Sequence, residues 1–255
     1  MKNIVGILVV SLSVIVSVKG QSTDQPRSEF EVRGLYSIPS GDTRFSTSGS
    51  TGSTISFKND FDFGNALGYG FRFSHKTETG KHKFLAEYSA VSWDRTRTLT
   101  RSFTFLGQTY VASLQTSSEL KLRTFRAMYS YRWGNEKIRI GPMFDMGVIS
   151  TSVELTGATN NGVRSAEGKI RKFAGTVGYD LDWNPVPSVT VFNNLGGIKF
   201  KNERLFHVEG GVKYFPARHF GVSGGYRFQR YKLSEDDNFI RVSSNGPFVG
   251  GIVRF

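Results

Sequence analysis

Segments in which apolar and polar residues alternate fill most of this chain, and this period of two is typical of β-strands that expose two different faces. The clearest segment, 173–183, alternates apolar residues with small or acidic ones and reads FAGTVGYDLDW. Comparable segments recur from about residue 29 to the last residue, separated by turns rich in Gly, Pro, Asn and Asp. No helical period or flexible linker interrupts the series. The pattern predicts an all-β, antiparallel fold in a single domain.

The composition fits strands with one apolar and one polar face. Aromatic residues make up 14% of the chain, with 22 Phe and 10 Tyr, and there are 29 Gly. The mean hydropathy is nevertheless slightly negative, as it is in membrane barrels, where a lipid-facing surface and a polar interior cancel in the average. A soluble β-sandwich can have a similar composition. The chain has no Cys, which excludes disulfides and a lipidated N-terminal Cys.

The first residues are typical of a secretory signal peptide. Lys2 provides a positive charge, residues 4–18 are mostly apolar, and Val18-Lys19-Gly20 offers small residues near a cleavage site. The apolar run is shorter than the roughly 20 residues that a membrane-spanning helix needs. We therefore expect residues 1–20 to be removed and residues 21–255 to form the mature domain.

The last strand adds a more specific signal. One of its faces is predicted to carry Val249, Gly251, Val253 and the terminal Phe255. Together with the signal peptide and the aromatic strands, this strand resembles those of the outer-membrane β-barrel proteins of Gram-negative bacteria, as a broad class without a subfamily. The resemblance implies a transmembrane, antiparallel, up-and-down β-barrel in the outer membrane. It also implies that the barrel-assembly machinery recognises these four residues.

The alternation predicts about ten strands, an even number that returns the two chain ends to the same side of the membrane. Eight strands remain if segment 188–201 and a neighbour are misassigned, because both faces of that segment contain apolar residues. A bulge is expected there near residues 193–197. The first strand is expected to end at Pro39, and the second to run over residues 61–75.

Two features are predicted on the side with longer connections. Segments 82–105 and 108–133 are about twice the length needed to cross a membrane. They are therefore expected to form a hairpin that projects beyond the membrane. Residues 157–169 are polar and rich in Gly and Asn, so we expect a loop there.

Charges of both signs are predicted to face the interior of the barrel. The structural interpretation is a network of paired ions that fills the lumen, and the functional one is a polar conduit. Barrels of about eight to ten strands have interiors filled by side chains, which favours the filled lumen over a general porin. The predicted lumen network comprises Glu29, Glu31, Arg33, Asp62, Arg72, Glu87, Arg126, Arg132, Arg139, Asp145, Asp180, Asp182, His207, Glu209, Lys213 and Arg227.

Few residues suggest an enzyme. Omptin-like outer-membrane proteases are ten-stranded and use Asp and His at the external rim, whereas three of the four histidines here lie beside predicted periplasmic turns. Only His207, which shares a face with Glu209, could pair as a general base with an orienting carboxylate. Such an inward pair is more often a lumen contact. No enzymatic activity, cofactor or metal is expected.

A cluster of basic residues lies in the predicted projecting hairpin, and the formal net charge of the whole chain is +12. Export makes nucleic acid an unexpected partner, whereas lipopolysaccharide phosphates carry the opposite charge and suit Arg. We expect the following residues to contact lipopolysaccharide, with an ordinary solvated hairpin as an equal alternative: Arg95, Arg97, Arg101, Lys121 and Arg123.

These observations together predict a non-enzymatic integral outer-membrane barrel with a charge-filled lumen. It would contribute to envelope integrity or to surface interactions through its external loops, with outer-membrane lipids as partners and a monomer favoured. A narrow channel for small solutes or ions is the alternative, and an omptin-like surface hydrolase is a more distant one.

Overall fold

The computed structural model describes residues 27–255 with the exception of 161 and 201. The predicted signal peptide, residues 1–20, lies outside the described residues. No helix within this part of the chain has the length and apolar character to cross a membrane.

Long antiparallel strands dominate the structure. The main ones are β1 (Ser28–Arg44), β3 (Ala66–Lys76), β4 (His82–Thr98), β7 (Gln115–Tyr131), β9 (Ile138–Thr159), β10 (Gly162–Val186), β11 (Val189–Phe200), β12 (Glu203–Tyr214), β13 (Phe220–Glu235) and β14 (Asn238–Arg254). Short elements complete the set, namely β2 (Ile55–Ser56), the π-helical turn η1 (Phe57–Phe61), β5 (Phe103–Phe105), β6 (Gln108–Tyr110) and β8 (Trp133–Gly134).

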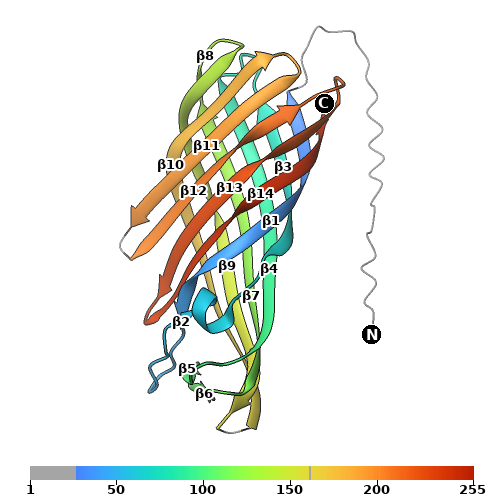
Figure 1. Ribbon diagram of the computed structural model, residues 1–255. Coiled ribbons are helices and arrows are strands. Elements are labelled where there is room, and N and C mark those ends of the chain that lie inside the picture. Colours follow the sequence, from blue (N-terminus) through green and yellow to red (C-terminus); the bar gives the residue numbers. More distant parts are fainter. Residues whose placement is uncertain (1–26, 161, 201) are drawn as a thin grey trace.

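The ten long strands form a closed ring, each paired with its neighbours in sequence (Figure 1). The ring closes where β14 pairs with β1 along most of its length, from Arg254 opposite Glu29 to Phe239 opposite Arg44. This closure confirms the predicted up-and-down barrel of ten strands. The C-terminus and the turns at 77–81, 135–137, 187–188 and 215–219 lie at one end, called here the terminal end, and β2, η1, β5 and β6 lie at the opposite, loop end (Figure 1).

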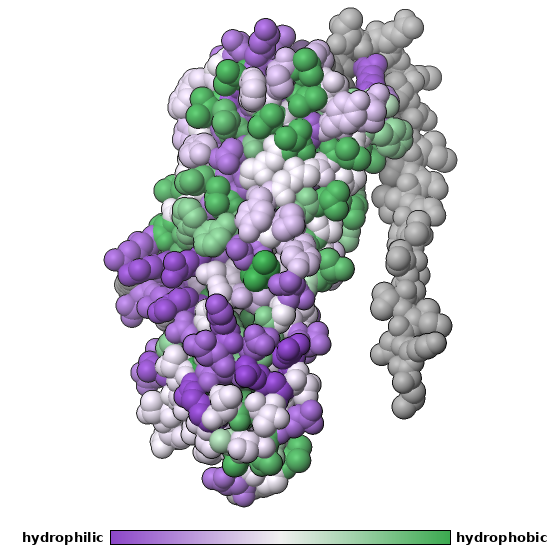
Figure 2. All heavy atoms as spheres, viewed as in Figure 1, coloured by the Kyte–Doolittle hydropathy of each residue, from purple (hydrophilic) through white to green (hydrophobic). Residues whose placement is uncertain are grey.

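Apolar side chains cover the outside of the barrel in its terminal half. The strand register places them at alternating positions, and they remain exposed although they are large. Examples are Phe30 on β1, Phe71 on β3, Phe125 on β7 and Val249 on β14, with exposed fractions of 38–66%. Figure 2 shows this apolar surface giving way to a hydrophilic one toward the loop end. Such a band is typical of strands that face lipid, and it confirms the predicted outward faces.

Four strands project beyond the rest of the barrel at the loop end, as two hairpins. The β4–β7 hairpin was predicted, but the β9–β10 hairpin replaces the loop expected at residues 157–169, which was wrong. β9 and β10 stay paired as far as Thr159 opposite Gly162, where Gly162 has a φ of +89° and closes the turn. The polar residues there lie on the solvated face of a strand, while Ile170 on the other face is buried.

Three local expectations were also wrong. β1 continues through Pro39 to Arg44, because its pairing with β3 stops at Ser37 and the missing N–H of Pro39 breaks no ladder on that side. The second long strand, β3, begins at Ala66 and not at residue 61, because η1 ends at Phe61 and Asp62 has a left-handed backbone conformation. The register shift in this region lies between Trp183 and Val186 of β10, while residues 193–197 pair regularly on both sides.

A second core, which the sequence did not predict, fills the loop end of the barrel. The segment between β1 and β3 and the β5–β6 hairpin fold inward over the ring, and their aromatic side chains pack against inward residues of the strands. Phe105 is fully buried and meets Phe45 edge-on at 5.4 Å between ring centroids. Trp93 donates a hydrogen bond of 3.0 Å from Nε1 to the carbonyl oxygen of Ser37. We call this set of buried apolar residues the loop-end core.

We expect Phe105→Ala to lower the free energy of unfolding by about 3–5 kcal/mol, because it removes a fully buried ring from a packed core. Val163→Ala, at a position 74% exposed near the tip of the β9–β10 hairpin, is the control and should change stability by less than about 0.5 kcal/mol. Urea titration in lipid vesicles, followed by tryptophan fluorescence, compares the variants. Equal stabilities of the two would contradict a packed loop-end core.

Candidate functional site

The terminal half of the lumen holds a buried network of charged side chains. They point inward because successive residues of a strand face opposite sides, and the alternate positions carry the apolar outer surface. The structure brings together nearly all the residues predicted for it. Those that are buried inside the ring are Glu29, Glu31, Arg33, Arg72, Glu87, Arg126, Arg132, Asp145, Asp180, Asp182, His207, Glu209, Lys213 and Arg227.

Glu209 of β12 is the centre of this network. One carboxylate oxygen accepts hydrogen bonds from Arg33 at 2.8 Å and from Arg72 at 2.6 Å, and the other accepts one from Arg227 at 2.7 Å. Arg72 and Arg227 also bind the carboxylate of Glu87, at 2.8 Å and 2.6 Å. Two carboxylates and three arginines from β1, β3, β4, β12 and β13 therefore cross the lumen and tie opposite walls together.

A second cluster closes the terminal end. Lys83 lies between the carboxylates of Asp180 and Asp182, at 2.8 Å and 3.2 Å, and Arg132 donates to Asp182 at 2.6 Å. Lys76 lies 3.1 Å from Asp182. Together these contacts tie β3, β4 and the segment after β7 to β10.

The sequence interpretation missed three cations of the network. Lys83 and Lys76 were not assigned, although the alternation that turns Phe84 outward also turns Lys83 inward. Arg254, in the last strand, lies 2.9 Å from Glu29, whose other oxygen is bound by Lys213 at 2.5 Å. The alternation of inward and outward residues along β4 would have identified Lys83.

Two predicted members lie outside the network. Asp62 follows η1 in the left-handed region, and its side chain is 62% exposed, 3.7 Å from Arg95. It was wrongly placed because residues 61–65 are not part of β3. Arg139 sits at the terminal rim, where its guanidinium donates to the carbonyl oxygen of Thr79 at 2.5 Å. It lies at the start of β9, beyond the level at which the lumen is closed.

His207 lies where the charged network meets the loop-end core. It is 3% exposed, and its Nε2 is 3.4 Å from Asp145. Glu209, the suggested orienting group, is instead bound by three arginines. A substrate would have to cross the loop-end core to reach this imidazole. Within the described part of the chain, no group of three or more His, Asp and Glu side chains is placed to hold a metal ion.

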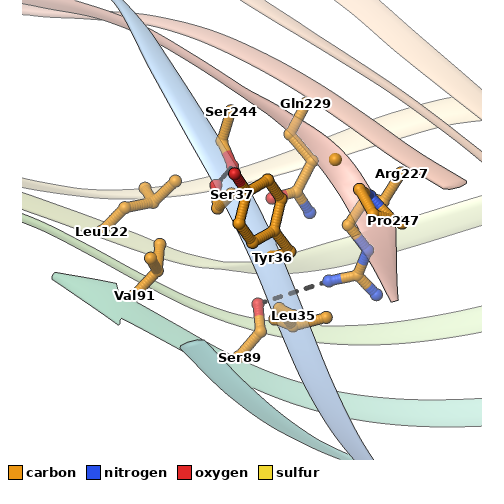
Figure 3. A pocket seen from close by; sticks show the side chains of 11 residues that line it. Leu35, Tyr36, Ser37, Ser89, Val91, Leu122, Arg227, Gln229, Ser244 and Pro247 are labelled. Carbon is orange, nitrogen blue, oxygen red and sulfur yellow. Dashed lines mark hydrogen bonds between the residues drawn. The ribbon is translucent and has the colours of Figure 1, made fainter. Parts of the chain in front are cut away.

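The space between the two halves of the lumen is small. A cavity of about 20 Å³ remains between Val91 and Leu122 on one side and Arg227 and Gln229 on the other (Figure 3). This volume holds about one water molecule. Beyond it, toward the loop end, Leu120, Val153 and Leu155 are completely buried. The lumen is therefore filled by ions at one level and by apolar side chains at the next.

The cations predicted to bind lipopolysaccharide divide into two groups. Arg101 donates two hydrogen bonds of 2.8 Å to Asp60 and one to the carbonyl oxygen of Thr54, and Arg97 donates to the carbonyl oxygen of Asn59 at 3.3 Å. Arg95 lies beside Asp62, so these three arginines contact the segment around η1. The other two are on the outer face of β7, where Lys121 is 2.8 Å from Glu119 and Arg123 is exposed.

The Arg101–Asp60 pair fixes the segment that covers the loop end. Burial alone would raise the pKa of Asp60, but the hydrogen bonds from Arg101 and the backbone N–H of Ser56 hold this pKa below its ordinary value. The carboxylate therefore stays ionised at neutral pH, and protonating it removes the charge that holds Arg101.

The architecture can be compared with solved structures. The outer-membrane protease OmpT from Escherichia coli superposes with a TM-score of 0.61 at 10% sequence identity, over 90% of this chain and 97% of OmpT. The translocator domain of the autotransporter NalP from Neisseria meningitidis gives 0.46 at 9% identity, over 91% of this chain and 90% of the domain. The attachment invasion locus protein Ail of Yersinia pestis gives 0.41 at 10% identity, over 91% and 100%.

No known protein family and no curated protein sequence matches the chain. The similarity to OmpT, at 10% identity, establishes the architecture alone. The chain therefore has the fold of a Gram-negative outer-membrane β-barrel, as the terminal strand and the alternation predicted, and no subfamily follows from it.

We expect Glu209→Gln to destabilise the barrel by about 3–5 kcal/mol, because it leaves three buried arginines short of one negative charge. Asp62→Asn removes a carboxylate that is exposed and should change stability by less than about 0.5 kcal/mol. Thermal unfolding in the same detergent measures both. Comparable losses of stability in the two variants would indicate that Asp62 belongs to the network.

A pH dependence follows from the lowered pKa of Asp60. The Arg101–Asp60 contact is fully formed above the unfolded pKa of about 3.9 and is lost as the pH falls through the lower folded value. A spin label attached through Lys58→Cys, which would be the single Cys of the chain, should become more mobile below about pH 4. In an Asp60→Asn background the label should already be mobile at pH 7 and independent of pH. A label with one mobility in both proteins would contradict this role.

Proposed function

We propose that this protein is a non-enzymatic integral barrel of the outer membrane that anchors a folded surface structure and does not conduct. The observation that carries the proposal is the doubly filled lumen, with the Glu209 network at one level and the loop-end core at the next. The apolar outer band supports the membrane location, and the two projecting hairpins at the end opposite the C-terminus support a periplasmic terminal end. The barrel would contribute to envelope integrity and to surface interactions.

The two alternatives lack a matching feature among the described residues. A narrow channel needs a continuous polar path, whereas the apolar side chains of the loop-end core interrupt it. A surface hydrolase needs an accessible nucleophile or base, whereas His207 is buried beneath that core. OmpT is a protease by name, but a similarity of fold does not transfer a reaction.

The two projecting hairpins support a surface role. Their inner faces pack into the loop-end core, while their outer faces are exposed and largely polar. We propose that these faces, together with outer-membrane lipids and lipopolysaccharide, are what the protein contacts in the membrane. Recognition of the terminal strand by the assembly machinery, through Val249, Gly251, Val253 and Phe255, is part of the same proposal; Val249, Val253 and Phe255 are exposed.

We expect the purified mature chain to give no discrete conductance steps in planar bilayers, because no water-filled path crosses either level of the lumen. A heat-modifiable gel shift of the same sample checks that the barrel is folded. Conductance steps from the folded protein would contradict the sealed lumen. If their size also changes in the Arg227→Glu variant, the narrow channel is favoured. The matched substitution on the outer surface, Arg123→Glu, should change neither the gel shift nor the absence of conductance.

A further inference from the structure

A row of basic side chains crosses the outer surface of the barrel on a face that the sequence interpretation did not single out. The strand register places Lys199 of β11 opposite Arg204 of β12, Arg204 opposite Lys232 of β13, and Lys232 opposite Arg241 of β14. Their inward neighbours Leu205, Leu233 and Val242 are buried in the loop-end core, so alternation directs all four cations outward. We call these four residues the basic row.

The row has far too little negative charge of its own. Directly opposite side chains in antiparallel strands are about 4.5–5.5 Å apart at Cβ, and like charges there destabilise the sheet. Asp42 of β1 ends the row and lies 3.4 Å from Arg241. Among the described residues, the side chains of Lys199, Arg204 and Lys232 have no ion pair or hydrogen-bond partner. The acidic side chains at the β13–β14 turn, Glu235, Asp236 and Asp237, lie further toward the loop end and are exposed.

The position of the row relative to the apolar band is the second observation. One row closer to the terminal end, Phe206 lies opposite Arg230 and Arg230 opposite Ser243. The following row is apolar over most of its length, with Val208 opposite Phe228. The change from apolar to basic surface thus takes two rows. Figure 2 shows hydrophilic side chains gathered on this face of the molecule, next to the apolar region.

A groove adjoins the basic row at this boundary. It is open to the outside, has a volume of about 550 Å³, and is formed where the strand pair β1–β2 overhangs β13 and β14. Arg230 and Arg241 supply its cations, Asp42 its one carboxylate, 3.4 Å from Arg241, and Phe228 lies at its apolar side. Hydroxyl groups come from Ser40, Thr54, Ser56 and Ser243. The groove therefore offers charge, hydrogen-bond donors and an apolar contact within one depression.

We propose that the basic row and this groove bind the phosphorylated headgroup of a glycolipid in the outer leaflet, such as lipid A. The proposal rests on the membrane location proposed above and gives it a specific partner site. Arginines suit phosphate through paired hydrogen bonds. An acyl-chain ligand also explains why the cations border the apolar band, because its chains lie against Phe228 and the band while its phosphates meet the row. A soluble polyanion needs no such border.

The test compares two double variants that lose the same charge. Arg204→Gln with Lys232→Gln removes the middle of the row, and Lys81→Gln with Lys137→Gln removes two exposed cations from turns at the terminal end. Native mass spectrometry of each barrel in detergent, titrated with purified lipid A, gives the affinity. We expect the row variant to bind roughly tenfold or more weakly, as the loss of charge-assisted contacts implies, and the turn variant to bind as the wild type does. Exchanging the two side chains, as Arg204→Lys with Lys232→Arg, should retain binding.

The control ligands test which part of lipid A the barrel recognises. Dephosphorylated lipid A should bind weakly to all forms, and millimolar inorganic phosphate should not displace lipid A. Equal affinity of the row and turn variants would overturn the proposal. Displacement by phosphate alone, or equally tight binding of heparin, would also overturn it in favour of a general anion surface. The heat-modifiable gel shift reports folding in each sample, so loss of the barrel is distinguished from loss of lipid binding.

Discussion

Everything in this structure depends on closing the ring of strands by backbone hydrogen bonds. A strand that faces hydrocarbon has no water to satisfy its N–H and C=O groups, so each must pair with a neighbour and the last strand must meet the first. The pairing of β14 with β1, from Glu29 to Arg44 on the β1 side, meets this requirement. Closure also creates an inside with no exit at the sides. The inward-facing polar side chains of each strand are then enclosed together with those of the strands on the opposite wall.

The charged network is the consequence of that confinement. A buried charge without a partner costs several kcal/mol, while a complete network with well-placed hydrogen bonds roughly offsets the cost of desolvation. Glu209 shows how completeness is reached, since its two oxygens serve arginines from three different strands. At the loop end, where the projecting hairpins leave the ring, the same confinement is met with apolar side chains. The two arrangements follow each other along the barrel axis, with ions at one level and apolar side chains at the next.

The parity of the strands could be predicted from the sequence, because a membrane barrel repeats one rule at every second residue. It placed Glu87, Asp180 and Arg227 correctly without knowledge of any partner. What it could not predict were the breaks in the rule. The left-handed turn at Asp62 and the extension of β1 past Pro39 depend on which neighbour is present at that level. The loop-end core depends on a segment folding back over the ring, and alternation carries no information about that. The ion pair of Arg101 could not be predicted either, because its partner Asp60 lies 41 positions away in the sequence.

The distribution of charge links the interior to the outer surface. The fully buried acids and bases of the lumen are equal in number, seven of each, if the imidazole of His207 and the loop-end Asp60 are left aside. These fourteen groups therefore contribute nothing to the formal net charge of +12 of the whole chain. The balanced network contributes none of this excess, and four of the outward cations lie in register on consecutive strands. Cross-strand repulsion opposes such a row, so an external anion against it would lower the free energy of the folded barrel, which is the physical basis of the glycolipid site proposed above.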